Sequence, residues 1–259
     1  MDLLHKIRAS RTTLKSQLQS EWDTDIIQDL SIPDLDALYN TKPTKDDLFA
    51  SLGQGFGCNL TLQNRLVPSH VLHIIYYNFP ASGDHPIKVT KTCQDKLAKL
   101  YGSGVYGSGS GFIDKDDSLL VILCVPLSET VGLAIEQFYQ AGQNELLISG
   151  IRDEVLKEND SLEEYLRYPI GYFRGAHIFS IDQLTIDITK HTLVPKHECI
   201  RGKPEIKDIL ETCNATLDQI PIIKRTDPQA KVMRLVPGDL CRIKRPTLAG
   251  LVVAYRVCQ

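Results

Sequence analysis

Amphipathic periodicity predicts three helices in the first 150 positions. Apolar residues recur every three or four positions within 4–18, 32–39 and 131–138, and this spacing places them on one helical face. We expect the first helix to run to about Trp22 and Gly142 to end the third, because glycine is common directly after a helix.

Continuous apolar runs predict strands between these helices. Residues 71–77 and 119–125 are rich in β-branched, aromatic and other large apolar side chains, which is typical of buried strands. Shorter strands are expected at 146–148 and near Ile178 and Ile186. Strands that alternate with helices favour an α/β (α+β) fold with a mixed sheet, which we assign to an N-terminal domain of residues 1–189.

Residues 190–259 predict a separate, small αβ domain. Lys203-Pro204 has the residues of a helix start, and Asn214 suits the left-handed position that follows a helix. Asp227-Pro228 has the N-cap and first-turn residues of a second helix. Two strands are expected at 240–244 and 251–257. The second of these strands presents an apolar face made of alternate residues.

Charge divides the chain in the same way. Residues 1–189 contain 16 Lys and Arg against 25 Asp and Glu, a net charge of −9, whereas residues 190–259 contain 13 against 7, a net charge of +6. A basic domain can face nucleic acid or an acidic protein surface, and charge alone does not choose between them.

Composition indicates a folded intracellular protein. Hydrophobic residues make up 42% and charged residues 24%, which are ordinary globular values. The longest apolar run, 119–125, is far shorter than the roughly 18 residues of a membrane helix. The seven cysteines are widely spaced without a C-x-x-C pair, so we expect reduced thiols. No membrane partner is expected.

The residue patterns of common active sites are absent from the sequence. The seven histidines never show H-x-x-x-H spacing, and there is no G-x-S-x-G. The glycines of 102–107 match a dinucleotide string, but no strand leads into them. Asp114, Asp116 and Asp117 fit a solvated turn better than a metal site. We expect no cofactor, no metal and no catalytic site of its own.

An ordered set of motifs in residues 190–259 and just before them resembles a known family. These motifs are Asp187-Ile-Thr-Lys-His-Thr-Leu-Val-Pro-Lys-His197, Gln219-Ile-Pro221, Arg225-Thr-Asp-Pro228, Gly238, Arg242-Ile-Lys-Arg245 and Tyr255-Arg-Val-Cys258. The set closely resembles the C-terminal assembly domain of the fifth subunit of eukaryotic DNA-directed RNA polymerases, a domain that also has an archaeal equivalent. Residues 1–189 are compatible with the jaw domain that precedes it in the eukaryotic subunit.

The resemblance implies a non-catalytic polymerase subunit. Its C-terminal assembly domain would dock on the largest subunit, and its jaw would lie near downstream duplex DNA, with weak contact made only within the assembled complex. The predicted partner-binding residues are Pro195, His197, Arg225, Asp227, Pro228, Arg242, Arg245, Tyr255 and Arg256. The predicted DNA-proximal residues, after the strand expected at 146–148, are Gly150, Ile151 and Arg152.

Two departures from the family pattern mark the chain as divergent, whether its source is cellular or viral. The loop 246–252 is one residue shorter than the family's and lacks its charged pair, and Arg234 stands where a glycine is usual. The expected location is the nucleus for a cellular polymerase, or a cytoplasmic viral factory or virion for a viral one. The alternative function is a free transcription-associated adaptor or nucleic-acid-binding protein that uses the same fold.

Overall fold

The computed structural model describes residues 2–42, 49–81, 84–86, 88–101, 113–149 and 170–259. Two compact units are present. The first unit contains Met1–Ser149 and Ala176–Ile186, and the second contains Gly150–Gly175 and Asp187–Gln259. The domain boundary after residue 189 stays a prediction. No helix among the described residues combines the length and apolar character needed to cross a bilayer.

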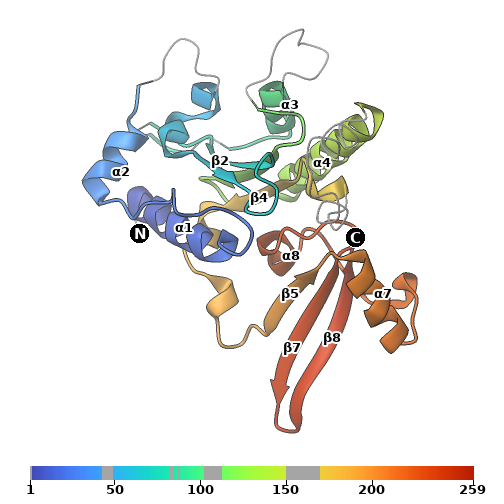
Figure 1. The fold of residues 1–259 in the computed structure, drawn as a ribbon. Coiled ribbons are helices and arrows are strands. Elements are labelled where there is room, and N and C mark those ends of the chain that lie inside the picture. Colours follow the sequence, from blue (N-terminus) through green and yellow to red (C-terminus); the bar gives the residue numbers. More distant parts are fainter. Residues whose placement is uncertain (1, 43–48, 82–83, 87, 102–112, 150–169) are drawn as a thin grey trace. The chain divides into compact units, whose positions relative to one another are not determined.

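A four-stranded mixed sheet forms the centre of the first unit (Figure 1). Its strand order is β1 (Leu60–Gln63), β2 (Val71–Tyr77), β3 (Ser118–Leu123) and β4 (Ala176–Ser180). β1 is antiparallel to β2, and the other pairs are parallel. The strands expected at 71–77, at 119–125 and near Ile178 are therefore confirmed, within a residue or two at their ends.

Helices cover both faces of this sheet, which explains why β3 reads as an unbroken apolar run. On one face, α3 (Cys93–Ala98) and α4 (Glu129–Ser149) pack in a core that includes Ile75, Val121 and Ile135. On the other, Ser10 of α1 (Leu3–Leu18) hydrogen-bonds the Tyr76 hydroxyl at 2.9 Å. The helix α2 (Ile32–Tyr39), expected at 32–39, begins at the N-cap Ser31 and has Pro33 in its first turn.

Two of the shorter predicted strands are wrong. Residues 146–148 lie in α4, which continues through Gly142. Phe138, Gly142 and Leu146 are all buried, and their spacing of four residues places them on one face of the helix. Burial of this face stabilises the helix by more than the cost of about 1 kcal/mol of one internal glycine. Ile186 is exposed between two short 3-10 helices, because none of the strands in the described part of the chain pairs with this segment to bury it.

The second unit is a four-stranded sheet with one helix on each face (Figure 1). The strand order is β5 (Lys196–Ile200), β7 (Leu240–Thr247), β8 (Gly250–Cys258) and β6 (Ile222–Ile223). On one face, α7 (Lys203–Thr212) packs Ile209 with Leu240 and Val257 of the sheet. On the other face, α8 (Pro228–Val232) packs Ala230 with Cys241 and Ile243.

Short 3-10 helices complete the chain. They are η1 (Phe49–Leu52), η2 (Gln54–Cys58), η3 (Lys99–Tyr101), η4 (Ile170–Tyr172), η5 (Ile181–Leu184), η6 (Ile188–Lys190) and η7 (Leu217–Gln219).

Local signals in the second unit act as the sequence predicted. Asp227 Oδ1 accepts a hydrogen bond from Gln229 N at 2.8 Å and caps α8. Asn214 follows α7 with a φ of +47°. Gly238 has a φ of +95° at the third position of the turn that Asp239 closes, a conformation that glycine adopts without strain.

Residues 170–175 belong to the second unit although they precede a strand of the first. Tyr172 is fully buried, and the guanidinium carbon of Arg201 lies 4.5 Å from its ring centroid. Arg234 lies 5.6 Å from the same ring. The aromatic ring of Tyr172 is thus part of the core of the second unit, a contribution that the sequence did not indicate.

Candidate functional site

The hairpin formed by β7 and β8 extends beyond its neighbouring strands (Figure 1). β5 pairs only with 240–244 of the hairpin, and β6 pairs only with 257–258. The two hairpin strands pair with each other out to Thr247 and Gly250, where Gly250 has a φ of +125°. Residues 245–253 therefore form a two-stranded projection, and the strands are longer than the sequence predicted.

Apolar side chains gather on this projection. Leu251, Val252 and Val253 are 62%, 51% and 42% exposed, and Leu248 at the tip is fully exposed. Leu251 and Val253 lie on the sheet face that carries Tyr255 and Val257, as the alternation in β8 predicted. Exposed apolar residues that cluster on a strand mark an interaction surface. We call residues 245–253 the hairpin tip.

A charged network lies on the same face, beside the hairpin tip. The carboxylate of Glu198 is 2.8 Å from Lys244 Nζ, 3.0 Å from Lys196 Nζ and 3.5 Å from Arg242 Nη1. The hydrogen bonds from Lys244 and Lys196 lower the pKa of Glu198 to about 2. Arg242 also binds Glu205 at 3.3 Å and lies 5.8 Å from the ring centroid of Tyr255.

The structure separates the predicted partner-binding residues into groups. Arg242 and Tyr255 belong to the charged network, so the guanidinium of Arg242 already has two carboxylate partners. Arg245 is exposed at the start of the hairpin tip. Arg256 is also exposed, on the opposite face from Tyr255, and its Nη1 donates to the carbonyl oxygen of Ile222 at 2.9 Å.

The remaining predicted residues have structural contacts at the base of the sheet. Arg225 is buried, and its backbone N–H donates to Gln259 O at 2.9 Å. Asp227 caps the helix that begins at Pro228. Pro195 lies directly before β5, and His197 lies within it. The carbonyl oxygen of Pro195 accepts a hydrogen bond from His197 Nδ1 at 2.7 Å. The sequence predicted the apolar face of the second strand, but Arg245 is the one residue of the hairpin tip that was among the predicted partner-binding residues.

Comparison with known proteins identifies this second unit. Residues 186–258 match the family model described as RNA polymerase Rpb5, C-terminal domain. Subunit Rpo5 of the DNA-directed RNA polymerase of Methanosphaera stadtmanae is 44% identical over 72 residues, which are 27% of this chain and 92% of the archaeal protein. The chain belongs to the Rpb5 family.

Other archaeal members give the same result. Subunit Rpo5 of Sulfurisphaera tokodaii is 40% identical over 78 residues, covering 30% of this chain and 92% of that protein. The Pyrococcus abyssi subunit is 45% identical over 73 residues, which cover 27% of this chain and 87% of that protein. Family membership thus rests on the Rpb5 C-terminal domain, whose hairpin and charged network are described above.

The predicted DNA-proximal residues Gly150, Ile151 and Arg152 lie outside the described residues. The strand that was expected to lead into them is the end of α4. Their assignment therefore stays a prediction, without support from a strand-to-helix turn.

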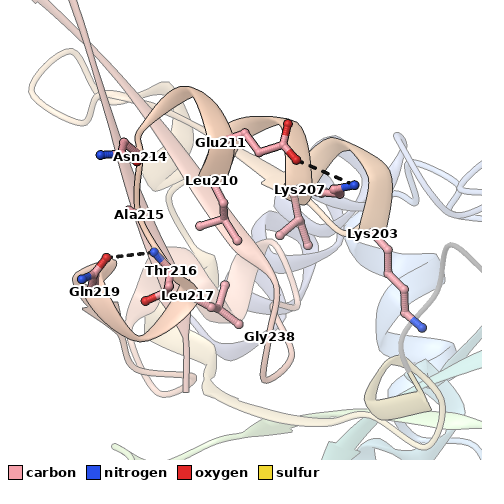
Figure 2. Close-up of a pocket in the computed structure, with 11 residues that line it drawn as sticks. Lys203, Lys207, Leu210, Glu211, Asn214, Ala215, Thr216, Leu217, Gln219 and Gly238 are labelled. Atoms are coloured by element: carbon pink, nitrogen blue, oxygen red, sulfur yellow. Dashed lines mark hydrogen bonds and ion pairs between the residues drawn. The ribbon is translucent and has the colours of Figure 1, made fainter.

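An open groove of about 580 Å³ lies beside α7 in the Rpb5-family domain. Figure 2 shows Leu210 and Leu217 on its two sides, with Lys203 and the Lys207–Glu211 ion pair along the helix. The Gln219 side chain accepts from Thr216 N at 2.9 Å and orders the loop opposite. None of the predicted site residues lines this groove.

Proposed function

We propose that this chain is a non-catalytic structural subunit of a multisubunit DNA-directed RNA polymerase and that its Rpb5-family domain docks on the largest subunit. The observation that carries the docking proposal is the hairpin tip, where apolar side chains stay exposed on a projection that no other described element covers. Exposed apolar surface is unfavourable in water, and its burial against a partner lowers the free energy.

Charge supports a protein partner for the hairpin tip. Arg245 is exposed beside the apolar residues and forms no ion pair with any of the described residues. A partner surface that is apolar at its centre and acidic at its rim complements this arrangement. Arg242, which binds Glu198 and Glu205, instead stiffens the strands below the tip.

The proposal extends to residues 1–189, which are compatible with a jaw domain and carry a net charge of −9. An acidic jaw disfavours broad phosphate contact, because each such contact requires a cation. We propose that residues 1–189 lie near downstream duplex DNA and touch it weakly, within the assembled complex. The protein would then work wherever its polymerase does: the nucleus of a cell, a viral factory or a virion.

Co-purification of tagged full-length chain with the polymerase tests the docking proposal. The variant L251D/V253D places two carboxylates on the hairpin tip, at exposed positions where folding should tolerate them. We expect recovery of the largest subunit to fall at least about tenfold, the effect of losing roughly 1.4 kcal/mol of binding. The control Leu193→Asp changes an exposed leucine elsewhere in the same unit and should leave recovery unchanged.

Full recovery with L251D/V253D would exclude the hairpin tip as the docking surface. A wild-type chain that purifies without any large polymerase subunit would favour the alternative, a free adaptor that uses the same fold.

A further inference from the structure

A small basic cavity lies in the first unit, between α1 and the segment that leads into α2. Its volume is about 120 Å³, which is room for a phosphate-sized group and a few waters at roughly 30 Å³ each. Its lining includes Arg8, Arg11, Lys15, Ile27, Asp29 and Leu35. None of them belongs to the Rpb5-family domain or to the docking surface proposed above.

Helical spacing brings three cations to this cavity. Arg8, Arg11 and Lys15 are three and four positions apart in α1, so they share one face of the helix. Lys15 Nζ donates to the carbonyl oxygen of Ile27 at 3.1 Å, which holds the ammonium at the rim. Asp29 is the only carboxylate among the lining residues.

Asp29 is engaged by the outermost cation. Both Nε and Nη2 of Arg8 lie 3.0 Å from Asp29 Oδ1. This pair is substantially exposed to solvent, so it neutralises little of the charge deeper in the cavity. Arg11 and Lys15 therefore face the cavity as two cations that have no carboxylate partner among the described residues.

Arg11 is the deepest of the three and lacks a counterion within the described part of the chain. Its side chain lines the cavity although the residue is only 6% exposed. Nη1 donates to the carbonyl oxygen of Cys58 at 3.3 Å, whereas the buried Nε has no hydrogen-bond partner among the described residues. A guanidinium stays charged at physiological pH.

The titratable groups that face Arg11 cannot balance its charge. They are the thiol of Cys58 and the hydroxyl of Tyr76. Burial raises the pKa of Cys58 to about 11 and raises that of Tyr76 as well, so both are neutral at pH 7. A buried, unpaired charge is costly, and an anion that entered the cavity would remove that cost.

We propose that this cavity binds the phosphate group of a ligand, with Arg11 at its floor and Lys15 and Arg8 at its rim. A planar guanidinium that lines a cavity without a carboxylate partner is suited to oxyanions, and charge-assisted hydrogen bonds to phosphate are among the strong ones. The group could come from free phosphate, from a nucleotide or from a nucleic-acid backbone, because all three present the same oxygens.

Titration of the full chain with sodium phosphate tests the proposal, with sodium chloride at equal ionic strength as the reference. We expect phosphate to raise the Tm, because a ligand that binds only the folded state stabilises it. The variant Lys15→Met, at an exposed position, should weaken phosphate binding about two- to fivefold. Arg11→Met should weaken it at least about tenfold and, in chloride, should have a Tm no lower than that of wild type.

Lys96→Met is the matched control, since it removes an exposed lysine from α3, outside the cavity. It should leave the phosphate response unchanged. If Arg11→Met does not fold, the comparison of Lys15→Met with Lys96→Met still decides the proposal. No phosphate-specific rise in Tm for wild type, or equal responses for Lys15→Met and wild type, would overturn it.

Competition then identifies the source of the phosphate group. Displacement of inorganic phosphate by a nucleoside monophosphate, with no displacement by duplex DNA, would assign the site to a small ligand. Displacement by duplex DNA at matched phosphate concentration would assign it to a nucleic-acid backbone.

Discussion

Arg201 Nε lies 3.1 Å from Asp239 Oδ2, and the two side chains are 9% and 1% exposed. The same carboxylate oxygen accepts a hydrogen bond from Val236 N at 3.0 Å. Arg201 also donates to the carbonyl oxygens of Met233 and Arg234 at 3.0 and 2.9 Å. This ion pair joins the end of β5 to the turn that begins β7, the first strand of the proposed docking hairpin.

Loss of Arg201 should therefore loosen the whole Rpb5-family domain. Arg201→Met leaves the Asp239 carboxylate buried without its cation, for which we expect a cost of about 3–5 kcal/mol. Hydrogen exchange of the full chain, followed by mass spectrometry, should show faster exchange in β5, β7 and β8. The control Lys207→Met breaks only the exposed pair with Glu211 and should change exchange little. Unchanged protection in Arg201→Met would contradict this role.

The N-cap of α8 should have a smaller, local effect. Asp227→Ala removes the acceptor for Gln229 N, and we expect a loss of about 1 kcal/mol. Faster amide exchange across residues 228–232 is the readout. Asp218→Ala, at an exposed acidic residue of η7, is the matched control and should match wild type. If both variants exchange alike, the cap contributes nothing measurable.

The pKa of Glu198 predicts a pH dependence for the second unit. Its folded-state pKa of about 2 lies below the ordinary glutamate value of 4.5. The charged network therefore stabilises the fold above about pH 5, and this contribution, about 1 kcal/mol or less, is lost as the pH falls towards 2. Glu198→Gln should be less stable than wild type at pH 7, and the two should converge near pH 2. A constant difference across that range would exclude this linkage.

Proximity of Ile151 to DNA can be tested within the assembled complex. A photoreactive residue at position 151 of a transcribing polymerase should label downstream duplex DNA. The free full-length chain should bind the same duplex negligibly at physiological salt, because one or two phosphate contacts release too few counterions. Absence of labelling, while other subunits crosslink efficiently to that DNA, would remove 150–152 from the interface.

Local chemistry explains how much of the fold the sequence could predict. Asp227-Pro228 and Asn214 were sufficient to predict the start of α8 and the end of α7, because helix caps depend on residues within one or two turns. The α4 error has the opposite cause: Leu146 is apolar in either a strand or a helix, and its burial eight positions after the buried Phe138, on the same face of one helix, becomes evident only in the structure.

The residues that the sequence could not predict are those that meet across long separations. Tyr172, Arg201 and Asp239 are far apart in the chain, and nothing in their local pattern shows that they pack together. Arg234 has a φ of +52° at a position where the family usually has glycine. Its ring contact with Tyr172 accompanies this unfavourable conformation.

Crosslinking from the hairpin tip is a direct test of docking on the largest subunit. A photoreactive residue at position 251 of the full-length chain, purified with its polymerase, replaces an exposed leucine at the centre of the proposed docking surface. We expect a dominant crosslink to the largest subunit and none from position 193 in the same domain. Efficient recovery of the polymerase with no crosslink from position 251 to the largest subunit would contradict it.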